Sequence, residues 1–452
     1  MLNAVRSNET QSSLRVARNS EQERILLSVF RLLENAGVEY CVPHGYDDFS
    51  SPMKSDVDCI ISANVSDRAL EALLLRNSEA IGAELVLRRN AYFVLASRDE
   101  NGTHSFIALD FSRNYDVCDL PLYSGRELLQ TRRSGNVRVP ASDIEFGAYL
   151  ARCVAKRSLN EDRTRRLSDL YQRSPLDCAQ QVSRFWSGTS AKLLVAGAES
   201  GDWTAVYDNL SNIAAELRRK AIGRHPARFL ANKILAIARR VKRLLNPDGL
   251  SVAFLGPDGA GKSSVIATLP SSLDFVFPRV SELGFAPGLL SFMRRGSRST
   301  SEPHGLQPRS PLISLARVAY WISYYILSWP ALRFALARST LVLYDRHFVD
   351  ILVDQRRYRY GGPLWLLRLA WRCIPKPDLI ILLDAPAEVL QARKQEVPME
   401  VSARQRQAYL TLIHTLPNGR VVDSSQSSED VINDIVEIIL RRTRPGYHAS
   451  TR

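Results

Sequence analysis

Cysteine is scarce in this 452-residue sequence, and the few cysteines present have no CxxC pair or histidine-rich spacing around them. They are scattered at Cys41, Cys59, Cys118, Cys153, Cys178 and Cys373. This pattern argues against a zinc site and against a disulfide framework. A reducing cytoplasm is therefore the simplest location to expect.

The sequence also lacks a long hydrophobic run. Its first twenty residues are polar and have no apolar core of the kind found in a signal peptide, so we expect a disordered tail over residues 1–20. The most apolar stretch, residues 318–330, is shorter than the roughly 20 residues needed to span a bilayer. We expect a buried helix there, with contact at a membrane surface as the alternative.

Acidic residues are outnumbered by basic ones, and the formal net charge is +13. An excess of this size favours phosphate-bearing ligands, nucleic acid or an anionic membrane surface, without choosing among them. No specific nucleic-acid partner is expected. The length predicts two or three domains, and the hydrophobic content of 45% is typical of a globular protein.

A phosphate-binding loop follows an apolar run that ends at Leu255, and it reads GxxxxGKS from Gly256 to Ser263. Its glycines allow backbone N–H groups to surround a phosphate, and Lys262 is placed to contact the β and γ phosphates of a triphosphate. The Ser263 hydroxyl is expected to bind Mg²⁺. The alternative is a glycine turn without a ligand. The expected binding residues are Gly256, Asp258, Gly259, Ala260, Gly261, Lys262, Ser263 and Ser264.

Charged residues follow two later apolar runs that are expected to be strands. Asp345 and Arg346 come after the first, where Asp345 could hold a magnesium-bound water and Arg346 could clamp an acceptor phosphate. Asp384 closes the second, and Arg393 lies on the helix that should follow it. Cations there can neutralise a transferring phosphoryl group. The alternative for Asp345 and Arg346 is a structural ion pair.

In order, the segments GPDGAGKSS, YDRH, PDLIILLDAPAEVLQARK and VVDSS resemble the thymidylate kinase family of P-loop kinases over roughly residues 249–442. The resemblance implies ATP and Mg²⁺ as cofactors, a small phosphate acceptor and a possible homodimer. It also implies that Asp258 contacts the acceptor sugar, Arg346 holds the acceptor phosphate and Arg393 belongs to a lid. The family's acceptor segment has no clear counterpart between Phe275 and Pro311, so the acceptor need not be thymidylate.

Three acidic residues stand out in the first part of the chain. Asp56 and Asp58 are two apart on an expected strand and therefore point to one face, and Asp110 ends another apolar run. Together they could form an oxygen cage for Mg²⁺ and a nucleotide. Residues 21–130 resemble the nucleotidyltransferase superfamily, although Tyr46 stands where that family prefers glycine or serine. Whether this site is active or a structural copy stays open at this stage.

The fold expected from these features is α/β, with an α+β nucleotidyltransferase-like domain over residues 21–130 and a P-loop parallel sheet with flanking helices over residues 247–445. Residues 131–246 are expected to be a helical linking region. Its last helix, residues 226–245, is basic and amphipathic. Such a helix more often packs on its own protein. The alternative is that it lies on an anionic membrane, and the protein would then be membrane-peripheral.

The expected function is ATP-dependent transfer of a phosphoryl group to a small acceptor, of nucleoside monophosphate kinase type. One alternative is a kinase for a sugar or another metabolite in nucleotide-sugar or surface-polysaccharide metabolism. Another is a nucleotide-gated peripheral membrane scaffold without transfer activity. A second, nucleotidyltransferase activity in the N-terminal part is a further possibility.

Overall fold

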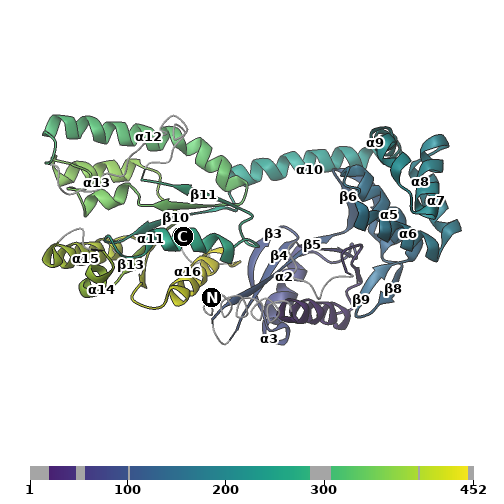
Figure 1. The fold of residues 1–452 in the computed structure, drawn as a ribbon, viewed down its shortest axis with the longest axis horizontal. Helices are drawn as coiled ribbons and strands as arrows, with labels where there is room; N and C mark the ends of the chain where they lie inside the picture. Colours follow the sequence, from purple (N-terminus) through teal and green to yellow (C-terminus); the bar gives the residue numbers. More distant parts are fainter. Residues whose placement is uncertain (1–19, 47–55, 100–101, 286–306, 395–397, 446–452) are drawn as a thin grey trace, which may run out of the picture. The chain divides into compact units, whose positions relative to one another are not determined.

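The computed structural model describes residues 20–46, 56–99, 102–285, 307–394 and 398–445 (Figure 1). Residues 1–19 of the expected disordered tail lie outside these ranges. The chain divides into two compact units, one formed by residues 1–238 with 443–452 and the other by residues 239–442. We call them the N-terminal unit and the C-terminal unit.

A five-stranded sheet with the order β1-β2-β5-β4-β3 opens the N-terminal unit. Strands β2 and β5 run parallel, whereas the other neighbouring pairs are antiparallel. A helix over residues 20–35 and the helix α2 pack apolar side chains against this sheet, and the Ser66 side chain caps α2 by accepting from the Ala69 N–H. The elements are β1 Tyr40–Cys41, β2 Val57–Ile61, α2 Asp67–Arg76, α3 Ser78–Ile81, β3 Glu84–Arg89, β4 Tyr92–Arg98 and β5 His104–Ser112.

Two hairpins and a group of helices complete the N-terminal unit. The β6–β7 hairpin shares a second core with the helices, whereas Val137 and Val139 of the β8–β9 hairpin pack in the core of the five-stranded sheet. The elements are β6 Asn114–Val117, β7 Leu120–Ser124, α4 Gly125–Leu128, β8 Thr131–Ser134, β9 Val137–Pro140, α5 Ser142–Ala155, α6 Glu161–Arg173, α7 Pro175–Phe185, α8 Gly188–Ser200 and α9 Thr204–Arg224. The helix α10, Pro226–Leu245, then leads into the C-terminal unit. The region expected to be helical, residues 131–246, begins with the β8–β9 hairpin and is otherwise helical; it belongs to the N-terminal unit up to residue 238, and the end of α10 belongs to the C-terminal unit.

A buried carboxylate links the start of the N-terminal unit to its helices. Glu145 on α5 is fully buried and accepts hydrogen bonds from Arg132, Arg166 and the Tyr46 hydroxyl. Because a buried charge must be paired, these contacts fix the turn at Tyr46 against α5. The tyrosine that departs from the nucleotidyltransferase pattern thus has a structural role.

The C-terminal unit is built on a five-stranded parallel sheet with the order β11-β12-β10-β13-β14 and helices on both faces (Figure 1). Strands β10, β12 and β13 are almost wholly buried, as their continuous apolar runs require in a covered parallel sheet. The elements are β10 Leu250–Leu255, α11 Lys262–Thr268, the 3-10 helix η1 Leu269–Ser272, β11 Arg279–Leu283, α12 Pro311–Ala337, β12 Thr340–Asp345, the 3-10 helix η3 Phe348–Leu352, α13 Leu364–Cys373, β13 Leu379–Asp384, α14 Ala387–Arg393, α15 Met399–His414, β14 Gly419–Asp423 and α16 Ser428–Thr443. This confirms the parallel α/β arrangement expected for the C-terminal half.

Helix α12 differs from the buried helix expected at residues 318–330. It runs for 27 residues, and Val318, Trp321 and Tyr325 mark the single stripe by which it packs on the unit. Its opposite side is exposed yet apolar. We call this side the apolar α12 face; its large exposed residues are Leu312, Leu315, Tyr320, Ile326, Leu327 and Phe334. The expectation of full burial is therefore wrong for one side of the helix.

Within the described ranges, no helix has both the length and the hydrophobicity needed to cross a membrane.

Candidate functional site

The phosphate-binding loop joins β10 to α11 at the carboxyl edge of the parallel sheet, where open α/β sheets bind ligands. Its shape depends on glycine. Gly256 has φ +143°, and a Cβ atom there would lie 2.6 Å from the Leu383 carbonyl oxygen. Gly259 has φ +85°, and its Cβ would lie 2.9 Å from the Leu390 carbonyl oxygen. Larger residues would therefore open the loop away from β13 and α14.

Lys262 is the buried cation of the loop. Its ammonium donates hydrogen bonds to the carbonyl oxygens of Gly256 and Pro257, at 2.7 and 2.8 Å. Burial, followed by the nearby charge of Arg346, lowers the pKa of Lys262 to about 7. Ser263 and Ser264 are exposed on the first turn of α11. The loop thus brings together the cation and the hydroxyls expected from the sequence.

Arg346 links the loop to the end of β12. It is buried, and its guanidinium donates to Asp258 in the loop and to Asp350 on η3, the latter at 2.9 Å. Arg357 also donates to Asp258. The backbone of Arg346 has φ +75°, a left-handed conformation that costs free energy for a residue other than glycine. The ion pairs therefore hold this side chain in a fixed place beside the phosphate loop.

Asp350 is the centre of a buried network that the sequence does not reveal. Its carboxylate is completely buried and accepts from Arg346, from the Tyr358 hydroxyl at 2.7 Å and from the Tyr409 hydroxyl at 2.6 Å. Although burial alone would raise the pKa of Asp350, the charge of Arg346 and the hydroxyl donors lower it. We call the set Asp258, Arg346, Asp350, Arg357, Tyr358 and Tyr409 the Arg346 network. The only signal in the sequence is the four-residue spacing from Arg346 to Asp350.

The remaining predicted residues lie at neighbouring strand ends. Asp345 is exposed and pairs in register with Phe254 of β10. Asp384 accepts two hydrogen bonds at 2.8 Å from Arg406 of α15, a residue that the sequence analysis did not single out. Arg393 on α14 donates to the Ser424 carbonyl oxygen at 2.8 Å. In this conformation Arg406, and not Arg393, is the arginine that faces the strand-end carboxylate.

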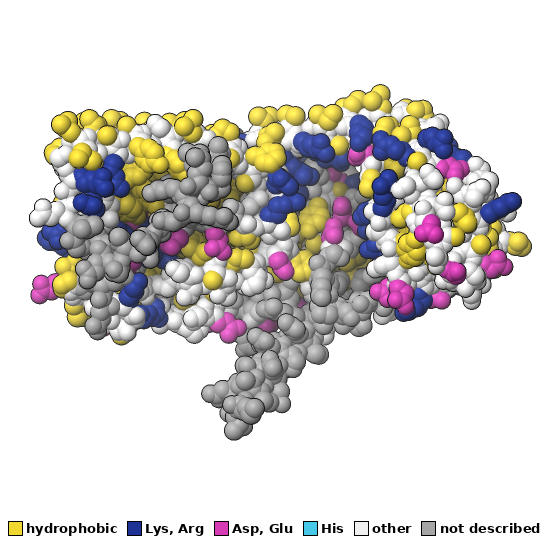
Figure 2. Space-filling view, turned by 45° about the horizontal axis from the view of Figure 1, so that its top comes forward, with side chains coloured by type: hydrophobic (Ala, Val, Ile, Leu, Met, Phe, Trp, Pro, Cys, Tyr) yellow, Lys and Arg dark blue, Asp and Glu magenta, His cyan; other side chains and the backbone are white. Residues whose placement is uncertain are grey.

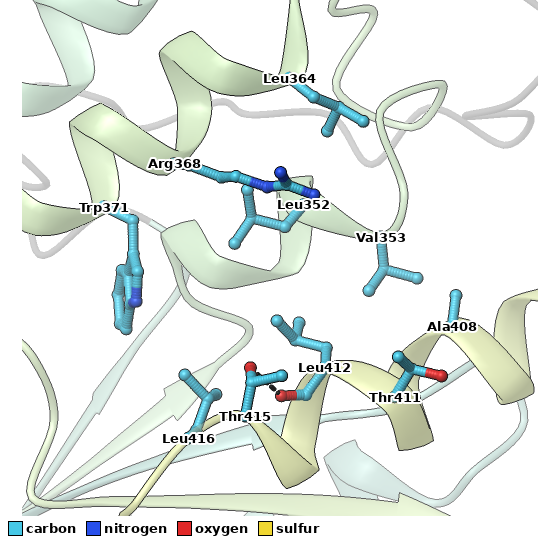
Figure 3. Close-up of a pocket in the computed structure, with 10 residues that line it drawn as sticks. All are labelled: Leu352, Val353, Leu364, Arg368, Trp371, Ala408, Thr411, Leu412, Thr415 and Leu416. Carbon is cyan, nitrogen blue, oxygen red and sulfur yellow. Dashed lines mark hydrogen bonds between the residues drawn. The ribbon is translucent and has the colours of Figure 1, made fainter.

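A pocket of about 590 Å³ lies elsewhere in the C-terminal unit, between η3, α13 and α15 (Figure 3). Its wall is mainly apolar, with Arg368 extending over it from α13 and Trp371 at one end. None of the residues expected to bind nucleotide lines it. Two of the elements that line it, η3 and α15, also carry Asp350 and Tyr409.

The N-terminal unit contains the second predicted site. Asp58 on β2 and Asp110 on β5 are register partners on parallel strands, and Asp56 comes just before β2. Carboxylate oxygens from these three residues lie within 4.8 Å of one another. The structure thus brings together the two acids that strand periodicity places on one face and the third acid, Asp110, that ends another apolar run.

One histidine and one arginine contact this cluster, and burial lowers the pKa of His44, which favours its neutral imidazole. His44 Nε2 lies 3.1 Å from Asp58, and Arg152 donates to the same carboxylate at 3.3 Å. Burial and the charge of Asp58 raise the pKa of Asp56. For Asp58, burial acts in the same direction, but His44, Arg152 and Lys156 outweigh it and lower the pKa. The oxygen donor set fits a hard divalent cation, for which carboxylates are the preferred ligands.

Comparison with known proteins finds sequence similarity between the C-terminal half and thymidylate kinases. No protein-family model matches the chain. A probable thymidylate kinase of Thermococcus gammatolerans is 34% identical over 121 residues, which cover 25% of this chain and 57% of the relative. The thymidylate kinase of Xanthomonas campestris pv. campestris is 27% identical over 219 residues, which cover 45% of this chain and 89% of the relative.

The C-terminal half has thymidylate kinase relatives. This similarity supports a P-loop nucleotide kinase on that part of the chain. The chain spans only about half the length of the archaeal relatives it matches. Among solved structures, a thymidylate kinase from Candida albicans matches with a TM-score of 0.33 and 18% identity, over 44% of this chain and 93% of that chain.

Proposed function

We propose that the C-terminal unit is an ATP-dependent kinase of nucleoside monophosphate type, which transfers the γ-phosphoryl group to a small phosphate-bearing acceptor. The observation that carries this proposal is the Arg346 network. It fixes a buried arginine next to a phosphate-binding loop, at the edge of the sheet where β10 and β12 end. A cation fixed beside the triphosphate loop suits a second, acceptor phosphate.

Phosphoryl transfer of this kind depends on position and charge more than on covalent chemistry. The loop amides and Lys262 would neutralise the triphosphate, with Lys262 exchanging its two loop carbonyls for phosphate oxygens. Arg346 would orient the acceptor phosphate, while Asp258 holds Arg346 and Arg357 in place. Ser263 and Asp345 would hold Mg²⁺, which would supply further charge neutralisation.

Thymidylate is the first acceptor to test, because the curated relatives are named thymidylate kinases. A sugar or another metabolite is the alternative, motivated by the pairing with a nucleotidyltransferase-like N-terminal part. The family's acceptor segment also has no clear counterpart between Phe275 and Pro311, so the acceptor need not be thymidylate. Residues 286–306, which make up most of the stretch between Phe275 and Pro311, lie outside the described residues.

The test is ADP formation by the full chain with Mg²⁺, ATP and a panel of nucleoside monophosphates, sugars and sugar phosphates. Acceptor-dependent turnover would support the kinase, and the preferred acceptor would identify its substrate class. ATP binding without transfer to any acceptor in the panel would contradict the kinase and favour the scaffold alternative.

For the N-terminal unit we propose a second candidate function, divalent-cation binding in support of nucleotidyl transfer. The specific observation is the approach of three carboxylates from two parallel strands to within 4.8 Å. Like charges held this close repel each other, and a divalent cation bound between them would relieve that repulsion. Titration of the full chain with Mn²⁺ alone, followed by calorimetry, tests the cation site. A titration that shows no binding attributable to these residues would remove this candidate.

A further inference from the structure

The apolar α12 face is an anomaly for a protein in water. A helix that is apolar all round is normally covered on every side, by its own protein, by a partner or by lipid. Here Leu312, Leu327 and Phe334 are 80%, 71% and 55% exposed. Figure 2 shows apolar side chains gathered along this edge of the molecule. Continuous exposed apolar surface of this kind marks an interaction site.

The last turns of α10 adjoin this face and belong to the same unit. Arg333 on α12 donates to the carbonyl oxygens of Leu244 and Leu245 at the end of α10, at 2.8 and 2.6 Å. These leucines are exposed, as is Val241 one turn earlier. None of the twenty residues of α10, all of which the structure describes, is buried. The end of α10 therefore extends the exposed apolar surface.

The two helices that form this surface carry charges of one sign. Neither α10 nor α12 contains an aspartate or a glutamate. The end of α10 instead carries the exposed cations Arg239, Arg240, Lys242 and Arg243. The next acid along the chain, Asp248, lies 3.9 Å from Arg243. An apolar face with a basic rim complements a surface that is apolar inside and anionic at its edge.

We propose that the apolar α12 face and the end of α10 dock on an anionic lipid bilayer, with the side chains of α12 in the interface and the α10 cations on the lipid phosphates. An interfacial helix of this type gains from buried apolar area and from attraction to anionic headgroups. A second copy of the chain is a poorer occupant. A symmetric contact would bring the cations of two such faces together without an acid from α10 or α12 to pair them.

The test is co-sedimentation of the full chain with vesicles of phosphatidylcholine containing phosphatidylglycerol, compared with phosphatidylcholine alone. We expect retention on the anionic vesicles that falls as salt is added, because exposed charges are screened. Replacing Arg239, Arg240 and Lys242 by glutamine should weaken retention roughly a hundredfold at low salt. The matched control carries the same change at Arg173, Lys192 and Arg219, exposed cations of the N-terminal unit, and should bind as the unmodified chain does.

A second pair of variants isolates the apolar contribution. Leu312→Gln with Ile326→Gln and Leu327→Gln should reduce retention by at least about tenfold, because these exposed side chains no longer enter the interface. Leu176→Gln, at a leucine that is 83% exposed on α7, should have no effect. The proposal does not depend on kinase activity, so its outcome is separate from the acceptor screen.

Two results would overturn the proposal. One is equal retention of the α10 variant and its matched control. The other is a self-associated species, seen by analytical ultracentrifugation without lipid, that the α12 variant dissociates while vesicle retention is unchanged. The second result would assign the face to another copy of the chain.

Discussion

The two candidate sites use strand-end carboxylates with different partners. In the N-terminal unit, three carboxylates converge from parallel strands, and they are contacted by the cation Arg152 and by the buried imidazole of His44. In the C-terminal unit, each of Asp258, Asp350 and Asp384 accepts a hydrogen bond from an arginine. A cluster of carboxylates suits a metal cation, and arginines fixed beside a phosphate loop suit phosphate. Strand-end carboxylates therefore have different uses in the two units.

The largest expected effect is on phosphoryl transfer. Lys262→Ala removes the buried cation of the loop, and we expect turnover to fall by about 10²–10³-fold, as for the loss of one preorganised donor in other active sites. The measurement is ADP formation with the preferred acceptor. Lys192→Ala, at an exposed lysine on α8, is the control. Undiminished turnover in Lys262→Ala would show that this loop is not the triphosphate site.

The next effect is on stability. Asp350→Asn removes the buried charge that balances Arg346, and breaking a buried pair in this way costs about 3 kcal/mol of unfolding free energy. Calorimetric unfolding of the full chain should show a lowered transition for the C-terminal unit. Asp345→Asn, at an exposed carboxylate, should change stability by no more than about 0.5 kcal/mol. Equal effects of the two variants would mean that the network contributes no stability.

A further expected effect is on metal binding by the N-terminal unit. Replacing Asp56 and Asp58 by asparagine removes the charge of two candidate metal ligands. The affinity for Mn²⁺ should therefore fall by more than the roughly 10–100-fold that follows the loss of a residue that only hydrogen-bonds to a ligand. Kinase turnover should be unaffected. Asp169→Asn with Asp208→Asn changes the charge equally at exposed sites and should leave Mn²⁺ binding intact. Calorimetric titration with Mn²⁺ distinguishes the two pairs, and equal affinities would show that the carboxylate cluster is structural.

The smallest expected effect is a pH dependence of nucleotide binding. The pKa of Lys262 is lowered to about 7, compared with about 10.4 for an ordinary lysine. Between these two pH values the unfolded chain holds more protons than the folded chain, so the free energy of unfolding rises with pH. Bound phosphate favours the charged lysine. Binding above about pH 7 should therefore take up a proton, and ADP affinity should fall by at most about tenfold per pH unit.

Calorimetric titration of ADP in two buffers with different ionisation enthalpies measures this proton uptake directly. Lys262→Met should abolish it. A pH-independent affinity in the unmodified protein would mean that the lysine stays charged in the absence of nucleotide.

The parts of the structure that could be predicted are those fixed by local spacing. The loop from Gly256 to Ser263 lies between a strand and a helix as its motif requires, and the alternation of residues along a strand explains why Asp56 and Asp58 point to one side. Their meeting with Asp110 depends on the pairing of β2 with β5. The parallel sheet followed from continuous apolar runs between helical segments.

The parts that could not be predicted depend on tertiary packing. Tyr409 and Arg406 come from a helix without a motif, and only the fold places them on Asp350 and Asp384. The apolar composition of α12 predicted burial, and no periodicity in it could show that one side faces outward. Likewise, the role of Tyr46 depends on Glu145, which is 99 residues away along the chain.

The left-handed backbone of Arg346 has a consequence for mutagenesis. Glycine adopts this conformation without strain, whereas alanine keeps the cost of roughly 1 kcal/mol while losing the guanidinium. Arg346→Gly is therefore the cleaner probe of the side chain, and Arg346→Ala reports side chain and backbone together. Glycine would relieve the backbone strain at this position, yet the chain has an arginine there. The two ion pairs of Arg346 therefore outweigh the cost of its left-handed backbone.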